Sequence, residues 1–181
     1  AAASRAPPPP GTVNLAGVSA TGTDLDGLPE AARVNFQPGA APVPAGYLVD
    51  AGAAYGDRGN GFSYGWNAAN PWGYDRNSAV SPDQRYDTRI NMQKGGTNWR
   101  WEIAVPNGRY RVRVVMGDAD WWDGVYKAAA EGVVVASGTP ASASRWVEGT
   151  QEVTVSDGRL TLTNAAGSSN NKICFLDVGS A

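Results

Sequence analysis

Two adjacent tryptophans and three aspartates occur within one short run of the chain, Gly117–Gly124 (GDADWWDG). The run follows the alternating stretch Arg109–Met116, which is typical of a β-strand, so we expect it to leave a sheet as a loop. Large apolar side chains on a loop indicate a binding site or a plug in the local core, and the neighbouring carboxylates favour a binding site. An indole can pack on the apolar face of a sugar ring while carboxylates accept hydrogen bonds from the sugar hydroxyls. Trp121 and Trp122 therefore predict a sugar-binding face.

The composition excludes several classes of function. The chain has 181 residues, 42% of them apolar, so one substantial core is expected rather than two. It has no histidine, which excludes histidine-dependent catalytic triads and histidine-ligated metals. Fifteen basic against seventeen acidic residues give a net charge of −2, which argues against nucleic acid as a partner. No apolar run approaches the roughly 20 residues needed to cross a bilayer, so we expect a soluble protein without membrane contact.

The N-terminal segment has the composition of a linker. Ala6–Gly11 contains four consecutive prolines, which favour an extended polyproline conformation, and Thr21–Gly27 is rich in turn-forming residues. We expect residues 1–32 to be a linker and lead-in, and residues 33–181 to be one β-sandwich module cut from a larger modular protein.

Short alternating segments separated by turns follow. Trp101–Val105 alternates apolar and other residues, and the Asn107–Gly108 pair is favoured in tight turns, so this segment is predicted to form a hairpin with Arg109–Met116. Glu152–Val155 and Arg159–Thr163 flank an Asp-Gly pair and are predicted to form a second hairpin by the same argument.

Two further segments, Gly132–Ala136 and Lys172–Val178, are almost continuously apolar, which favours strands in the buried centre of a sandwich. The single cysteine, Cys174, is expected to be a buried hydrophobic residue. There is no long amphipathic helix, and the chain has 23 glycines. Together these features predict an all-β fold, an antiparallel β-sandwich of jelly-roll type.

Arg109, Arg111 and Arg113 alternate with apolar residues and form a basic stripe on one face of their strand. We interpret the stripe as a solvated face whose long side chains cover the sheet. The alternative interpretation is a cationic platform for an acidic polymer such as a uronate.

The half of the chain between Tyr47 and Trp101 is rich in aromatic residues placed among Gly, Asn and Asp. Such loops can hold aromatic rings beside hydrogen-bonding side chains, as a sugar site requires, but aromatic rings also close the ends of a sandwich. For each of these residues both roles remain open. They are Tyr55, Phe62, Tyr64, Trp66, Trp72, Tyr74, Tyr86 and Trp99.

Five short motifs occur in the order found in malectin and malectin-like domains: Val34–Gln37, Gly61–Trp66, Gln84–Arg89, Trp101–Val112 and Asn170–Asp177. The chain therefore resembles the galactose-binding-like superfamily over roughly residues 33–178. It is similar in particular to the accessory modules of secreted bacterial polysaccharide lyases and glycoside hydrolases. The resemblance implies a carbohydrate-binding module, secreted and non-catalytic, that docks an attached catalytic domain onto plant or algal cell-wall glycan.

The resemblance also implies site residues. Tyr64 stands where the family has its first loop aromatic residue, and Tyr86 matches the tyrosine of a short motif that ends in arginine. Trp121 and Trp122 correspond to an aromatic pair after the long central strand. Asn170 replaces the family's aspartate before the final strand, so the family's diglucose preference is not transferred. The expected ligand-binding residues are Tyr64, Trp66, Tyr86, Asp120, Trp121, Trp122, Asp123, Tyr126, Asn170 and Asn171.

Other functions remain open on the sequence. No cofactor is required, but Asp118, Asp120 and Asp123 could hold a structural calcium ion, and Asp24 and Asp26 form a weaker cluster. A small glycoside hydrolase could use two loop carboxylates, drawn from this loop or from Glu102 and Glu148, and a polysaccharide lyase could use Tyr126 with Lys127. A protein-binding adhesion module is the third alternative. We expect a monomer whose partners are polysaccharides or oligosaccharides.

Overall fold

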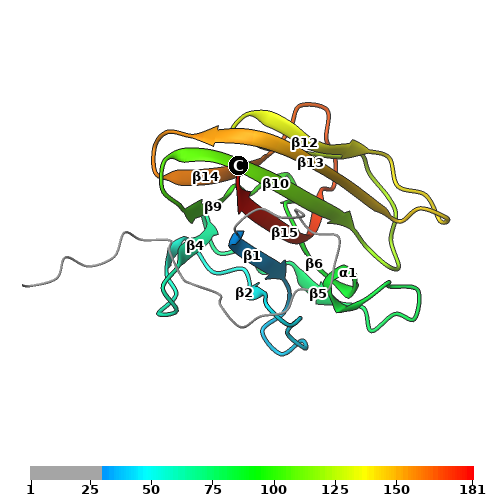
Figure 1. Cartoon of the computed structure of the whole chain (residues 1–181). Helices are drawn as coiled ribbons and strands as arrows, with labels where there is room; N and C mark the ends of the chain where they lie inside the picture. The colour runs from blue at the N-terminus through cyan, green and yellow to red at the C-terminus, as the bar shows by residue number, and fades with distance from the viewer. Residues whose placement is uncertain (1–29) are drawn as a thin grey trace, which may run out of the picture.

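The alternating segments of the sequence form two β-sheets that pack face to face (Figure 1). This arrangement is seen in a computed structural model, which describes residues 30–181. The first sheet contains β1 (Glu30–Phe36), β2 (Leu48–Asp50), β5 (Gly73–Asp75), β6 (Thr88–Asn91), β10 (Gly108–Gly117), β13 (Trp146–Val155) and β15 (Lys172–Ser180). The second sheet contains β3 (Gly56–Asp57), β4 (Ser63–Trp66), β9 (Trp101–Ala104), β11 (Tyr126–Ala130), β12 (Val133–Gly138) and β14 (Arg159–Asn164). A separate two-stranded ribbon joins β7 (Gln93–Lys94) to β8 (Thr97–Asn98), and α1 (Gln84–Asp87) is a four-residue helix.

The strand order confirms the predicted antiparallel β-sandwich. The order is β13-β10-β15-β1-β2 in the first sheet, with β6 beside β15 and β5 beside β6, and β12-β11-β14-β9-β4-β3 in the second. All paired strands are antiparallel except β1 and β2. Strand β1 begins at Glu30, ahead of the expected domain boundary at residue 33, and the predicted linker otherwise lies outside the described residues. Within residues 30–181, no helix is long and apolar enough to cross a membrane.

Both predicted hairpins are wrong in their pairing. Strand β9 pairs with β14 and β4 in the second sheet, whereas β10 pairs with β13 and β15 in the first. The Asn107–Gly108 turn and the Asp157–Gly158 turn therefore carry the chain from one sheet to the other. The two turns lie side by side and are joined by two hydrogen bonds. The Val105 amide donates to the Gly158 carbonyl (3.1 Å), and the Gly158 amide donates to Asn107 Oδ1 (2.7 Å). Alternation of apolar residues identifies the buried face of a strand but not the strand it pairs with. A hairpin within one sheet and a crossing between the two sheets would bury the same face.

The core between the sheets is built around tryptophans. Trp66 and Trp101 are fully buried, and Phe36 contacts both rings edge-on at centroid distances of 5.8 and 5.3 Å. Their indole N–H groups donate to the buried carboxylate of Asp50, at 2.7 Å from Trp66 and 2.8 Å from Trp101. The amide of Gly52 donates to the same carboxylate, so the core carries a fully hydrogen-bonded acid rather than an isolated charge.

Strand β15 is buried on both faces, as its apolar sequence predicted. Its outer side carries a second cluster in which Cys174 and Phe175 pack with Val115, and Tyr86 lies edge-on to Phe175 at 5.0 Å. Cys174 is thus a buried hydrophobic residue, as expected. The other apolar segment behaves differently: β12 is an edge strand whose Val133 side chain is exposed. The prediction that both segments lie in the buried centre was wrong for β12.

The basic stripe on β10 is a partly solvated sheet face. Arg109 pairs with Glu152 on the neighbouring strand β13, and Arg113 pairs with Glu148 (2.8 Å) and with buried Asp177 (3.5 Å). The cross-strand pairs support the interpretation of this face as a structural surface.

Candidate functional site

The loop after β10 is organised by one buried carboxylate, that of Asp118. Its Oδ1 atom accepts hydrogen bonds from the amides of Asp120 (2.9 Å) and Trp121 (3.3 Å), which fixes the start of the loop. Two guanidinium groups bind the same carboxylate. Arg76 contacts both carboxylate oxygens at 2.8 Å, and Nε of Arg89 contacts Oδ2 at 2.7 Å. Asp118 therefore ties the tryptophan loop to the segment after β5 and to β6.

These partners set the ionisation of the carboxylate. Burial by itself raises the pKa of Asp118, but the hydrogen bonds from Arg76 and the charge of Arg89 outweigh it and hold the pKa below its usual range. Asp118 is consequently charged in the folded protein at neutral pH.

The two tryptophans of the loop have different surroundings. Trp121 is 61% exposed and lines a hollow of about 300 Å³. Trp122 is 39% exposed and does not line this hollow; its ring lies against the guanidinium of Arg145, at 4.6 Å from the centroid. The structure therefore separates a pair that the sequence treated as one surface.

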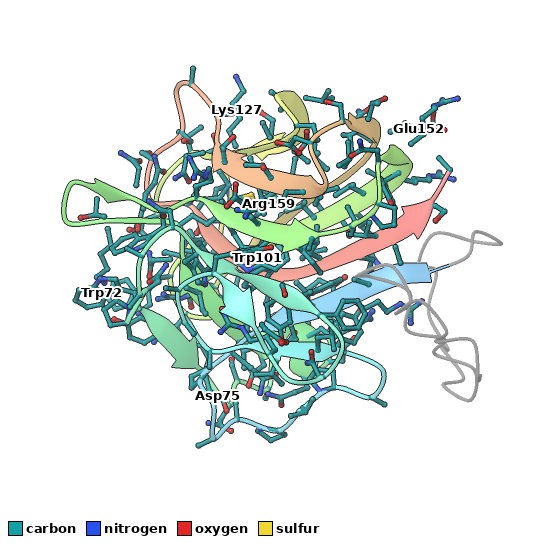
Figure 2. All side chains as sticks on the ribbon, turned by 90° about the vertical axis from the view of Figure 1, so that its left-hand side faces the viewer. Trp72, Asp75, Trp101, Lys127, Glu152 and Arg159 are labelled. Atoms are coloured by element: carbon teal, nitrogen blue, oxygen red, sulfur yellow. The ribbon has the colours of Figure 1, made fainter. Side chains whose placement is uncertain are left out.

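The hollow lies where β5, β6, β7 and the start of β15 meet the tryptophan loop. Figure 2 places Trp72 and Asp75, which lie just before and at the end of β5, toward one end of the molecule, with Glu152 toward the other. The lining is mostly polar and cationic. It consists of Tyr74, Arg76, Arg89, Asn91, Lys94, Trp121, Asp123, Asn170 and Lys172.

Asn170 closes one side of the hollow in a left-handed conformation, with φ of 56°. Its side chain accepts a hydrogen bond from Asn91 (3.1 Å) and donates to Asp123 (2.5 Å). The close approach of the two loops requires a glycine at position 124, because a Cβ atom there would lie 2.4 Å from the carbonyl oxygen of Ser169. The position of Asn170 is therefore fixed by backbone packing.

Lys172 enters the hollow from the first residue of β15. Its ammonium group donates to the Trp121 carbonyl (3.1 Å) and to Asp123 (2.5 Å), while its side chain is almost completely buried. Burial lowers the pKa of Lys172, and the neighbouring Asp123 offsets part of that shift.

Cations stacked on aromatic rings form another part of the lining. The guanidinium of Arg89 lies 4.0 Å from the centroid of the Tyr74 ring, and that of Arg76 lies 5.1 Å from it. The ammonium of Lys94 lies 4.6 Å from the Trp72 ring. Such contacts hold long side chains in place while leaving N–H groups available to a ligand.

Two more hollows adjoin this one along the β7–β8 ribbon. The first, of about 500 Å³, shares Lys94 and Asn170 with the tryptophan hollow. The second, of about 410 Å³, shares Gln93, Asn98 and Ser168 with the first. The surface beside Trp121 therefore continues along a line of amide and hydroxyl side chains.

Of the ten residues that the sequence nominated, three line the hollow: Trp121, Asp123 and Asn170. Asp120 is half exposed and lies 3.8 Å from Arg76, outside the lining. Trp122 lies against Arg145, as described above.

The other five lie outside the lining of the hollow. Trp66 and Tyr126 are fully buried, and Tyr64 is nearly so, with its hydroxyl donating to the Val49 carbonyl (2.7 Å). Asn171 is buried and donates to the Lys127 carbonyl (2.8 Å), while Tyr86 belongs to the cluster outside β15. A ligand at the surface cannot reach the buried rings, which corrects the expectation that they form contacts. They pack inward because their positions alternate with the outward face of their strands.

Sequence reasoning missed five lining residues, namely Arg76, Arg89, Asn91, Lys94 and Lys172, and it left the role of Tyr74 open. Arg89 and Asn91 alternate on β6, which is a signal for a shared face, but nothing local indicates that this face meets the tryptophan loop. That meeting depends on the pairing of β6 with β15 and of β5 with β6.

The aspartates of the loop do not converge on a cation site. Asp118 is bound by two arginines and Asp123 by Lys172. Among residues 30–181 there is no group of three His, Cys, Asp or Glu side chains that could hold a metal ion. Asp24 and Asp26 lie outside the described residues.

The candidate catalytic groups are also engaged elsewhere. Glu102 pairs with Arg159 (3.3 Å) on the second sheet, and Glu148 pairs with Arg113 on the first. Burial raises the pKa of Tyr126, which is the opposite of what a general base requires.

Comparison with known proteins identifies the fold. No family model and no curated protein matches the sequence of the chain. Several solved structures share its architecture, including the following three. Protein YXIM of Bacillus subtilis matches with a TM-score of 0.58 and 23% identity, over 83% of this chain and 40% of that protein. A β-glucuronidase of Bacteroides uniformis matches with a TM-score of 0.55 and 13% identity, over 83% of this chain and 18% of the enzyme. A chain of the complex of the plant peptide RALF23 with FER and LLG2 matches with a TM-score of 0.55 and 12% identity, over 84% of this chain and 40% of that one. The chain thus spans less than half the length of each, and at these identities the likeness is one of fold.

Proposed function

We propose that this chain is a non-catalytic carbohydrate-binding module that holds an extracellular polysaccharide-degrading enzyme on cell-wall glycan of plant or algal origin. The observation that carries the proposal is the placement of Trp121, a largely exposed indole at the rim of a polar hollow. A pyranose ring could stack on the indole while Asp123 and Asn170 exchange hydrogen bonds with its hydroxyls.

The shape of the surface supports a chain-like ligand. The three adjoining hollows along the β7–β8 ribbon offer amide and hydroxyl groups beyond the tryptophan site. A part of similar fold makes up 18% of a β-glucuronidase of Bacteroides uniformis, so this fold occurs within a carbohydrate-active enzyme. A tethered module raises the effective concentration of substrate near the active site without forming a contact to the bond that is cut.

The engagement of the candidate acids with cations favours binding over catalysis. A hydrolase or lyase would release reducing ends or unsaturated products from polysaccharide. We expect neither product from this chain alone.

Trp121 and Trp122 provide a matched test. In calorimetric titration with polysaccharide fragments, we expect Trp121→Ala to weaken binding at least about tenfold, the loss of roughly 1.4 kcal/mol of contact free energy. Trp122→Ala, which removes the same side chain from the same loop, should bind within about twofold of the unchanged protein.

Equal losses for both variants would show that the loop as a whole, and not the hollow, forms the contact. Glycan-independent capture of a protein partner by the unchanged chain, with no sugar bound, would support the adhesion alternative instead.

A further inference from the structure

The charge of the hollow differs in sign from that of the chain. Four cationic side chains line it, from Arg76, Arg89, Lys94 and Lys172. Three carboxylates lie near these cations. Buried Asp118 binds Arg76 and Arg89, Asp123 is part of the lining, and Asp120 lies beside Arg76. One net positive charge therefore remains at this site in a chain whose overall net charge is −2.

The cations retain unused hydrogen-bond donors. Arg76 binds Asp118 through Nε and Nη2, and Arg89 uses Nε for Asp118 and Nη1 for Asn91. Within residues 30–181, this leaves Nη1 of Arg76 and Nη2 of Arg89 without a protein acceptor. In the same part of the chain, Lys94 has no carboxylate partner and is held only by the Trp72 and Tyr74 rings.

Guanidinium and ammonium groups donate hydrogen bonds and accept none. A neutral sugar hydroxyl uses such a donor through one weak acceptor, whereas an anionic oxygen group offers several acceptors and a charge. The donor set on the Arg76, Arg89 and Lys94 side of the hollow therefore matches an anion better than a hydroxyl. Asp123 and Asn170 on the other side match hydroxyls.

We infer that the hollow selects an acidic saccharide, with the anionic group of the sugar facing Arg76, Arg89 and Lys94 and its ring on Trp121. This inference rests on the proposed function and names the ligand class of that site. A uronate carboxylate and a sulfate ester supply the same chemistry. Burial lowers the pKa of Arg89, and the charge of Asp118 offsets part of that shift.

Titration with matched ligands tests the inference. The probes are galacturonate, mannuronate and glucuronate oligosaccharides, each beside its carboxyl-reduced neutral counterpart, and a sulfated galactan oligosaccharide beside its desulfated form. We expect at least one acidic member to bind about tenfold more tightly than its neutral counterpart, with an advantage that shrinks as the salt concentration rises. A preference confined to the sulfated probe identifies sulfate as the anionic group.

Equal or tighter binding of every neutral counterpart would overturn the inference and leave the proposed function standing. No binding to any glycan would overturn the proposed function itself.

Two lysines provide the matched variants. Lys94→Gln removes a cation from the hollow, and Lys127→Gln removes one from β11, outside the hollow lining. We expect Lys94→Gln to weaken binding of the acidic oligosaccharide roughly fivefold and to leave the neutral one unchanged, while Lys127→Gln changes neither. Equal weakening of acidic and neutral ligands by Lys94→Gln, or no weakening of either, would contradict an anion contact on this side of the hollow.

Discussion

Asp118 connects three separate parts of the chain through a single side chain. Its carboxylate is completely buried and joins Arg76, Arg89 and the loop amides. Removing one partner of a buried ion pair leaves the other charge uncompensated, which costs far more than the loss of an exposed pair.

We therefore expect Asp118→Asn to lower the free energy of unfolding by about 3 kcal/mol, measured by urea denaturation. Asp120→Asn, in the same loop but half exposed, should stay within about 0.5 kcal/mol of the unchanged protein. A small effect at Asp118 would mean that the two arginines find other acceptors.

The pH dependence of stability supplies an independent check on Asp118. Its pKa is lowered in the folded state, so its stabilising contribution is complete above about pH 4, the range of an unfolded aspartate, and is lost as the pH falls through the folded pKa. Asp118→Asn lacks this contribution. Its stability relative to the unchanged protein should therefore recover as the pH falls below about 4, in denaturation curves measured across that range.

Asp50 is a second buried acid with a different role, because its carboxylate accepts hydrogen bonds from two indoles of the core. Asn at this position offers one acceptor oxygen and places an NH₂ group near an indole N–H. We expect Asp50→Asn to destabilise the fold by about 2 kcal/mol and to shift the fluorescence of Trp66 or Trp101, measured in the folded state. An unchanged unfolding midpoint would show that the core rearranges around the amide.

Local composition identified the exposed part of the site but not its charge. Trp121 and Asp123 were predictable from the composition of their loop, because binding residues are often carried on loops. Asn170 was nominated by the resemblance to malectin-like domains. Arg89 and Lys172 were not predictable, since each begins or continues a strand that reads as structural and reaches the hollow only through long-range pairing. The buried aromatic residues were misassigned for the converse reason: ring type does not reveal which side of a strand faces inward.

At the scale of elements, the sequence located six strands of the two sheets, β9, β10, β12, β13, β14 and β15, but not their partners. Strands β10, β14 and β15 were recognised with small errors at their ends, whereas only the last four of the ten residues of β13 were predicted. The inward face of β10 was predicted correctly. The turns at Asn107–Gly108 and Asp157–Gly158 were read as hairpins because their residue types suit tight turns in general. Crossing between sheets depends on the twist and stacking of both sheets, which no local window contains.

The packing of β13 against β12 gives an element-scale prediction. A Cβ atom at Gly149 would lie 2.0 Å from the carbonyl oxygen of Val135, a backbone atom that cannot move aside. We expect Gly149→Ala to lower the free energy of unfolding by about 2 kcal/mol, as overpacking of a close contact does. Gly56→Ala, in an open position on β3, is the control and should change stability by less than about 0.5 kcal/mol in the same denaturation assay. Similar effects at both positions would point to backbone entropy as the cause rather than the contact.

For the molecule as a whole, the fold class followed from strand-like alternation, frequent glycine and the lack of helical periodicity. The strand order did not, because it is determined by which faces can be covered at once. Strand β15 shows the difference: its apolar run indicated burial, and only the structure shows that its outer side is covered by Tyr86 and Trp146.

The thiol of Cys174 is a probe of global unfolding of the protein. Cys174 is fully buried and burial raises its pKa, so both access and ionisation oppose its reaction. We expect a thiol-reactive dye to label native protein far more slowly than protein in urea, with labelling rates that follow global unfolding. Rapid labelling under native conditions would mean that the outer cover of β15 opens locally.

The direction of β15 also determines where the protein can be attached to a surface without blocking the hollow. The strand begins with Lys172 at the hollow and ends at Ser180, beside the start of β1, since Gly179 is paired with Glu30 (Figure 1). At about 3.3 Å per residue, the eight steps from Lys172 to Ser180 separate the two ends of the strand by roughly 26 Å. Attachment of the chain through its C-terminus would accordingly leave the hollow facing away from the point of attachment. A biosensor surface or a fused reporter can therefore be joined there without blocking the hollow.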